Sequence, residues 1–199
     1  MEDKLYVYMF RSRNKDNKGL ENFKERVKTI VDYEYNEDKI LIKYERFVRE
    51  GLPGEKTRLY KSVNARDEAK IREDIIIRLI KDKTPIPNIE RLVASAAQQI
   101  ENRAENKWLF DFDVDNEKLV DEFINDIKEF TTYHWDEPKT LLRAIEGEKA
   151  EKYKTPNGYA VVVNHGFDTR DLLKKWKDYD ITLKRDELLF LRMEENKWN

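Results

Sequence analysis

The residues best placed to do chemistry lie in one acidic segment, Trp108-Leu109-Phe110-Asp111-Phe112-Asp113-Val114-Asp115. Side chains alternate between the two faces of a strand, so the aromatic rings share one face and the aspartates share the other. Neighbouring carboxylates repel each other, and Mg²⁺ or Mn²⁺ relieves this repulsion because hard cations prefer oxygen ligands. Asp111 and Asp113 are therefore candidate metal ligands for phosphoryl transfer. The alternative is a solvated aspartate face that ends in a helix cap.

Two further candidates flank the apolar segment 159–164. The turn Thr155-Pro156-Asn157-Gly158 precedes this segment, and backbone N–H groups of such a turn can bind a phosphate. His165 follows the segment beside Gly166, where an imidazole can titrate near neutral pH or bind phosphate. The alternatives are an ordinary turn, with Asn157 and Gly158 as turn residues, and a structural loop histidine.

Basic residues supply the remaining candidates. Arg58, Lys184 and Arg185 are candidate phosphate contacts because each lies in or beside an apolar, aromatic segment. Asp186 follows Arg185 and is a candidate third carboxylate for a metal. The alternatives are solvated basic side chains and an acidic turn residue.

Composition limits the class of protein. The 199 residues fit a single domain, with an N-terminal α/β part at about 1–106 and a site-bearing part at about 107–199. The formal net charge of −2 is not typical of a general polyanion binder, although it is compatible with a local basic patch. The chain has no cysteine, which excludes disulfides and thiolate metal sites. With no signal-peptide pattern and no long apolar run, we expect a cytoplasmic protein without membrane contact.

Hydrophobic periodicity predicts an α+β fold, with a mixed or antiparallel central sheet and helices packed on it. The apolar stripe of the helix after Asn64 is Ile71, Ile75, Ile76, Leu79 and Ile80. We expect a β-hairpin across 39–63, and a last strand or hairpin across 181–193. The other expected strands are 4–10, 108–115, 132–135 and 159–164. The other expected helices are 20–31, 88–100, 117–130 and 169–177.

The order of these features resembles the archaeo-eukaryotic primase (primase–polymerase) superfamily. Leu109-Phe110-Asp111-Phe112-Asp113 resembles its Asp-x-Asp motif, Thr155-Pro156-Asn157-Gly158-Tyr159-Ala160 its small-residue turn motif, and Arg185-Asp186 its late acidic motif. The resemblance implies a primase-like catalytic core in which Asp111, Asp113 and Asp186 hold two metals. It also implies a basic lining that binds nucleic acid and a nucleoside triphosphate. Ala160 stands where the family places its nucleotide-binding histidine, and His165 replaces that residue only if it reaches the same site.

Three functions follow as hypotheses. The first is metal-dependent nucleotidyl or phosphoryl transfer on nucleic acid, with Mg²⁺ or Mn²⁺ as cofactor. The second is a non-catalytic viral accessory protein, such as a phage protein of DNA replication, that binds nucleic acid or a host protein in the host cytoplasm. The third is a phosphatase of the haloacid-dehalogenase type, which also uses Asp-x-Asp after an apolar strand; here Val114-Asp115-Asn116 departs from its pattern.

Overall fold

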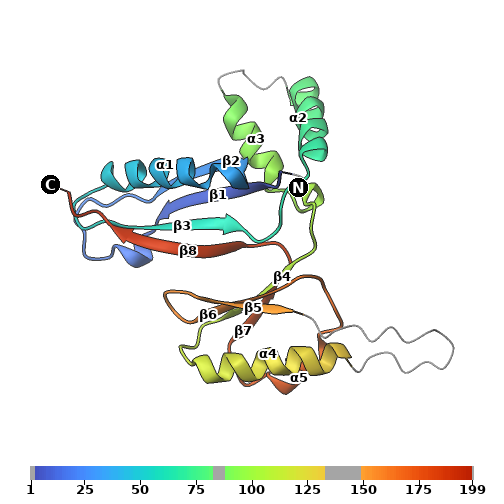
Figure 1. Cartoon of the computed structure of the whole chain (residues 1–199). Coiled ribbons are helices and arrows are strands. Elements are labelled where there is room, and N and C mark those ends of the chain that lie inside the picture. Colours follow the sequence, from blue (N-terminus) through green and yellow to red (C-terminus); the bar gives the residue numbers. More distant parts are fainter. Residues whose placement is uncertain (1–2, 83–87, 133–148, 199) are drawn as a thin grey trace. The chain divides into compact units, whose positions relative to one another are not determined.

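The computed structural model describes residues 3–82, 88–132 and 149–198 (Figure 1). The chain forms two compact units: unit 1 consists of Met1–Glu105 and Leu188–Asn199, and unit 2 of Asn106–Glu187. The fold class is α+β, as predicted, and each unit has its own antiparallel four-stranded sheet. The subdivision expected near residue 106 coincides with the boundary between the units, whereas the last strand belongs to unit 1.

Unit 1 has the strand order β2-β1-β3-β8. The strands are β1 (Leu5–Ser12), β2 (Arg26–Tyr33), β3 (Lys56–Ser62) and β8 (Leu188–Glu195). Helix α1 (Glu37–Arg49) packs on one face of the sheet, where its Tyr44 contacts Phe10 edge to face at 5.4 Å. Helices α2 (Glu68–Asp82) and α3 (Ile89–Ala97) contribute Ile71, Ala96 and Ala97 to a second cluster with Leu5 and Val7 of β1.

Unit 2 has the strand order β5-β6-β4-β7. The strands are β4 (Trp108–Phe112), β5 (Ala150–Lys154), β6 (Tyr159–Val163) and β7 (Ile181–Lys184). Helices α4 (Glu117–Thr132) and α5 (Arg170–Lys175) cover one face of this sheet. The core between sheet and helices contains Phe110, Phe123, Val161 and Leu172, all fully buried.

Two predicted elements have the wrong type. The segment predicted as a strand at 39–48 is helix α1, and its buried residues Ile40, Tyr44, Phe47 and Val48 follow a helical period. In the segment predicted as a helix at 20–31, residues 26–31 instead belong to strand β2, which pairs along its whole length with β1. The predicted hairpin across 39–63 is therefore wrong as well, although β3 itself lies within it.

The end of the chain also differs from the prediction. Residues 181–193 form two strands, but β7 pairs with β4 and β8 pairs with β3, so the two do not form a hairpin. Asp67, rather than Asn64, caps α2, because its carboxylate accepts the Lys70 backbone N–H at 3.1 Å. The strand expected at 132–135 lies almost wholly outside the described residues. None of the described helices is both long and apolar enough to cross a bilayer.

Candidate functional site

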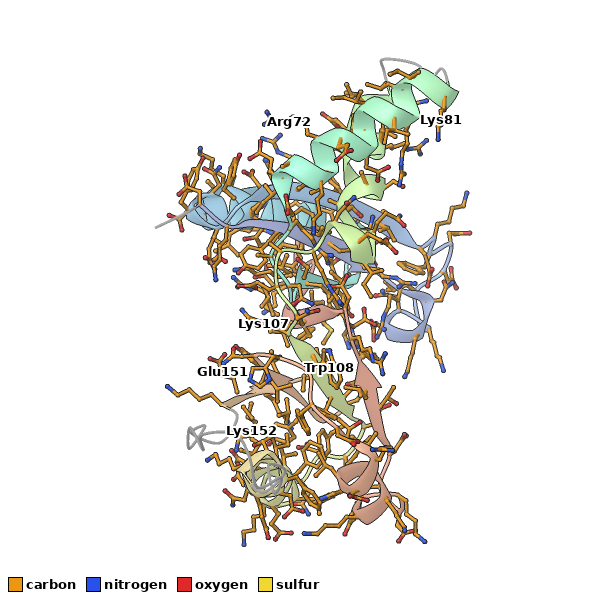
Figure 2. The ribbon with its side chains drawn as sticks, turned by 90° about the vertical axis from the view of Figure 1, so that its right-hand side faces the viewer. Arg72, Lys81, Lys107, Trp108, Glu151 and Lys152 are labelled. Atoms are coloured by element: carbon orange, nitrogen blue, oxygen red, sulfur yellow. The ribbon has the colours of Figure 1, made fainter. Side chains whose placement is uncertain are left out.

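The aromatic face of β4 is buried, as the alternation of its residues predicts. Phe110 and Phe112 contact Phe123 of α4 edge to face, with ring centroids 5.1 and 4.8 Å apart. Trp108, at the start of the strand, packs partly buried against the same core (Figure 2). The burial of these rings orients the strand, so Asp111 lies on the face away from α4.

A lysine side chain neutralises Asp111. The Nζ of Lys184 donates to Asp111 Oδ2 at 2.8 Å, and both side chains are about one-third exposed, at 32% and 31%. Burial by itself lowers the pKa of Lys184, but the hydrogen bond and the negative charges of Asp111, Glu187 and Asp113 outweigh it and raise this pKa. The cation that offsets the repulsion on this face is therefore an ammonium group of the protein itself.

The strand register separates the other predicted members of the acidic site. Asp111 lies opposite Ala160 of β6 and Thr182 of β7. Because both neighbours run antiparallel to β4, the residues that follow them, His165 and Asp186, lie beyond the Trp108 end. Asp113 follows the opposite end. Ala160 is the residue opposite Asp111, and Val163 lies about 10 Å further along the strand. His165 follows two residues after Val163, so the register places it away from Asp111.

The donor set does not fit the two-metal site that the primase resemblance implies. In the described part of the chain, no three or more histidine, aspartate or glutamate side chains are grouped so that they could hold a metal ion. Asp111 is engaged by Lys184, and the register does not bring Asp186 to Asp113. Metal-dependent transfer therefore stays a prediction of the sequence, without further support from this geometry.

The glycine turn before β6 has a packing role. A Cβ on Gly158 would lie 2.1 Å from the backbone oxygen of Phe112, so only glycine permits this close approach to the end of β4. The Gly158 N–H donates to Thr155 Oγ1 at 3.1 Å, and the Thr155 N–H donates to Gly158 O at 3.0 Å. These N–H groups close the turn, while Asn157 is exposed at its tip.

One other predicted residue, Arg185, lies near the indole of Trp108. The guanidinium of Arg185 is 5.2 Å from the centroid of the Trp108 ring, a cation–π distance. Gly166, next to His165, packs against the same ring, since a Cβ there would lie 2.1 Å from an indole carbon. His165 Nδ1 lies 3.4 Å from Gly166 O.

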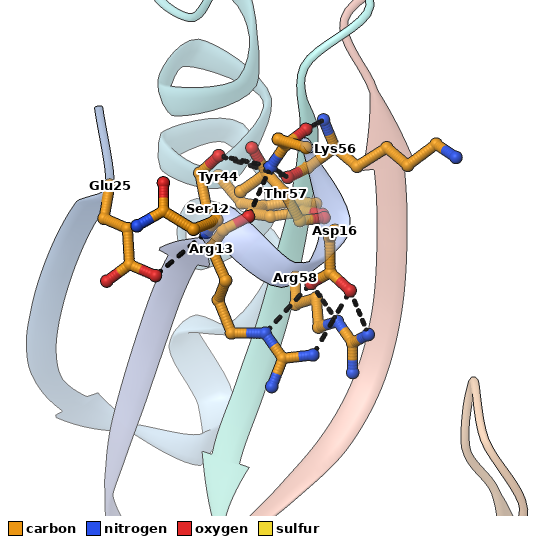
Figure 3. Close-up of polar contacts among 10 residues, drawn as sticks. Ser12, Arg13, Asp16, Glu25, Tyr44, Lys56, Thr57 and Arg58 are labelled. Atoms are coloured by element: carbon orange, nitrogen blue, oxygen red, sulfur yellow. Dashed lines mark hydrogen bonds and ion pairs between the residues drawn. The ribbon is translucent and has the colours of Figure 1, made fainter. Parts of the chain in front are cut away.

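Arg58 belongs to unit 1 and lies in a different cluster from the other candidates. Its Nε and one terminal nitrogen donate to the two oxygens of Asp16 at 2.7 and 2.5 Å (Figure 3). Arg13 donates to the same carboxylate at 2.9 and 3.2 Å. Burial opposes ionisation of Asp16, but the hydrogen bonds from Arg13 and Arg58 outweigh it and hold the pKa of Asp16 below its ordinary value.

Around this cluster the sheet of unit 1 presents two cross-strand rows of side chains, which we call the two-row face. These are its eight members, in the strand order β2, β1, β3, β8: Val27, Arg11, Arg58 and Met193 in the first row, and Thr29, Met9, Tyr60 and Phe190 in the second. Val27 is 53% exposed and Met193 40% exposed, so both ends of the first row are accessible. The rings of Tyr60 and Phe190 meet edge to face at 6.0 Å.

The charges near the two-row face do not balance. The guanidinium groups of Arg13 and Arg58 bind the carboxylate of Asp16, Glu25 acts on Arg13, and Arg11 lies opposite Arg58 in the first row. The Nε of Arg11 is buried and has no hydrogen-bond partner among the described residues. A buried donor without a partner is costly and calls for an explanation. Arg11 and Arg13 are partly exposed as whole residues, so an anion can approach their guanidinium groups, although the Nε of Arg11 and the side chain of Arg58 are buried.

Sequence reasoning identified Arg58 but missed the rest of the two-row face. The available signal was a period of two: Arg11 and Arg13 continue one face of the predicted strand 4–10, and Arg58 and Tyr60 share one face of the predicted strand 57–63. Phe190 carried no comparable signal, because its place beside Tyr60 depends on the pairing of β8 with β3. No protein-family model, no curated protein and no solved structure matches this chain.

Proposed function

We propose that unit 1 binds single-stranded nucleic acid on the two-row face. The observation that carries this proposal is the pairing of an arginine row with an aromatic row on one sheet face: Arg11 and Arg58 lie in the first row, Tyr60 and Phe190 in the second. Guanidinium groups bind phosphates through several N–H donors, and aromatic rings stack on unpaired bases. A single strand of nucleic acid carries a phosphate and an unpaired base in every nucleotide. Its phosphates can therefore lie along the arginine row while its bases lie along the neighbouring aromatic row.

The phosphate contacts come from guanidinium nitrogens of Arg13 and Arg11, which are partly exposed, while Arg58 is only 6% exposed and holds Asp16 in place. A guanidinium has five N–H donors, and the bonds to Asp16 engage only two nitrogens each of Arg13 and Arg58. The pairing with Asp16 holds these side chains in place, so little side-chain entropy is lost when a phosphate binds. Arg11 contributes the second guanidinium, whose Nε lacks a partner among the described residues.

The aromatic row supplies the base contacts. Tyr60 and Phe190 are half-buried, so each ring is anchored while part of it is accessible. Met9 and Met193 flank the rings on this face, and their flexible thioethers can adapt to bases of different size. Stacking is tolerant of sequence because every base has a π-face, so we expect weak sequence preference. The local excess of guanidinium groups reconciles nucleic-acid binding with the net charge of −2.

The test is fluorescence anisotropy with labelled single-stranded DNA, single-stranded RNA and a duplex, in titrations of the full chain at several salt concentrations. We expect both single strands to bind more tightly than the duplex. Tyr60→Leu should weaken binding about tenfold, since one stacked base contributes about 1–3 kcal/mol. Arg11→Gln should weaken binding and lower the slope of log K against log salt by about 0.7, the value for one phosphate on a single strand.

Two controls make this test specific. Lys174→Gln removes one positive charge from the surface of unit 2 and should leave affinity almost unchanged. Circular dichroism and melting temperature should show that Tyr60→Leu and Arg11→Gln remain folded. The proposal fails if the wild-type chain binds no single strand at low salt. It also fails if both folded variants bind as tightly as the wild type.

A further inference from the structure

Helix α2 carries an apolar surface that no described part of the chain covers. Ile76, Ile77 and Ile80 are 52%, 42% and 75% exposed. Most of the other exposed large apolar side chains lie singly, which is normal for a protein surface, but these three are neighbours within five residues of one helix. We call them the isoleucine stripe.

Helix α2 is apolar on two sides, which distinguishes it from an ordinary surface helix. Ile71 is 3% exposed and, with the half-buried Ile75, packs into the cluster that α3 and the sheet share. The isoleucine stripe lies on another side, because residues 76, 77 and 80 are turned away from residues 71 and 75 at 100° per residue. The single apolar stripe predicted from the sequence is therefore wrong, since Ile76 and Ile80 do not join the core. A helix that is apolar on two sides normally has a neighbour on each.

Charged residues at the two ends of the stripe indicate what that second neighbour is. Glu73 and Lys81 are exposed, and neither forms an ion pair with another described residue. Arg72, by contrast, already pairs with Glu68 of its own helix. Figure 2 shows Arg72 toward the start and Lys81 toward the end of α2. Ile77 lies midway between Glu73 and Lys81, four residues from each.

We propose that this surface binds a second copy of the chain, through antiparallel pairing of α2 with α2 about a two-fold axis near Ile77. A two-fold axis at this position places the isoleucine stripes of the two copies together. It also places Glu73 of each copy opposite Lys81 of the other, at both ends of the contact. The chain thus complements itself in charge and in apolar surface. This inference is independent of the proposed nucleic-acid binding.

The contact is short, so the dimer is weak. Glu73 and Lys81 are about 12 Å apart along the helix axis, and a patch of this length is smaller than a standard stable interface. We expect a concentration-dependent equilibrium between monomer and dimer, measured by sedimentation or by light scattering over a range of protein concentrations. A chain that stays monomeric at all concentrations up to about millimolar overturns the proposal.

Crosslinking locates the axis. The chain contains no cysteine, so Ile77→Cys introduces its only thiol. A short bismaleimide should convert most of this variant to a covalent dimer at concentrations where the wild type dimerises. Ile42→Cys is the matched control, because Ile42 is an equally apolar residue of helix α1 and is 62% exposed. Equal crosslinking of the two variants, or none at Ile77→Cys, contradicts the proposed axis.

A charge exchange tests the antiparallel register. Glu73→Lys and Lys81→Glu should each weaken the dimer several-fold, since each places like charges opposite one another. The double variant Glu73→Lys with Lys81→Glu should restore the wild-type association, because both cross-copy pairs return with exchanged sign. Ile80→Glu should abolish association in either background. If the double variant associates no better than the single variants, the two-fold pairing at Ile77 is wrong.

Discussion

Asp16 of unit 1 and Asp111 of unit 2 have similar local roles and different surroundings. Each carboxylate lies by a four-stranded antiparallel sheet and accepts hydrogen bonds from basic side chains. Asp16 is 10% exposed and is bound by two guanidinium groups, whereas Asp111 is 31% exposed and is bound by one ammonium group. The comparison shows that a dense run of aspartates in the sequence does not by itself mark the most strongly organised charges. Those charges surround Asp16, in a segment with few acidic neighbours.

The difference has a chemical consequence. A planar guanidinium binds a carboxylate through two parallel hydrogen bonds and keeps further donors for a second anion. An ammonium is a compact charge. The Nζ of Lys184 binds Asp111 and lies 3.8 Å from Oε2 of Glu187. The cluster in unit 1 thus keeps guanidinium donors for an anion, while the face of Asp111 in unit 2 sets three carboxylates, those of Asp111, Asp113 and Glu187, against the single ammonium of Lys184. This contrast supports the assignment of binding to unit 1.

Asp16→Asn should have the largest effect on stability. The substitution leaves two guanidinium groups, one of them 8% exposed, without their carboxylate, and the loss of one partner from a buried pair costs about 3–5 kcal/mol. Urea unfolding measures this cost. Glu45→Gln, which removes an exposed pair with Arg49 in the same unit, should cost less than about 1 kcal/mol. Equal costs for the two variants would contradict the contrast between buried and exposed pairs.

The same variant should change the response to acid. The pKa of Asp16 in the folded chain lies below the ordinary value of 3.8, so its contribution to stability is complete above the unfolded pKa and is lost as the pH falls through the folded pKa. The difference in unfolding free energy between the wild type and Asp16→Asn should therefore be constant above about pH 5 and shrink below about pH 4. A difference that stays constant down to pH 2 would show that Asp16 carries no lowered pKa.

Gly158→Ala should have an intermediate effect. The new Cβ would meet the backbone oxygen of Phe112, which cannot move aside like a flexible side chain, so we expect a loss of about 1–3 kcal/mol. Gly19→Ala is the matched control, since nothing lies within 4 Å of its Cβ position. Thermal melts of both variants provide the measurement. An unchanged melting temperature for Gly158→Ala would reopen a phosphate-binding role for this turn.

The smallest effects are expected at the pair of Lys184 and Asp111. Lys184→Met removes an ion pair that is about one-third exposed, so the loss of stability should be about 1 kcal/mol or less. Millimolar Mn²⁺ or Mg²⁺ should leave the melting temperature of the wild type unchanged, because the ammonium of Lys184 already neutralises Asp111. A metal-induced rise that disappears in Asp111→Asn with Asp113→Asn would break the comparison and restore support for the metal-dependent function.

Local periodicity predicted part of this molecule well. The alternation along β4 correctly assigned its aromatic residues to the core and Asp111 to the other face. The helical spacing of Leu119, Val120, Phe123 and Ile127 correctly predicted α4. These elements could be predicted because a single face of each contacts a single core. Their apolar residues therefore recur at one spacing, every second residue in β4 and every three to four residues in α4.

Periodicity failed where the sequence contains two patterns. In segment 39–48 the residues Ile40, Ile42 and Tyr44 alternate as in a strand, but Ile40 and Tyr44 also fit a helix, which leaves Ile42 exposed. Segment 26–33 contains a helical spacing, and its pairing with β1 makes it a strand instead. In both cases the contact with another part of the chain outweighs a local preference of a few tenths of a kcal/mol per residue.

The sequence by itself determined the α+β class, the buried face of β4 and the position of most strands and helices after residue 56, because these follow from which residues avoid water. Only the tertiary structure decided which charges meet. Arg58 pairs with a carboxylate 42 residues away, and Phe190 reaches Tyr60 because β8 joins the sheet of unit 1. Such contacts depend on strand order and register, which join segments far apart in the chain. The two-row face exists only when that register has formed.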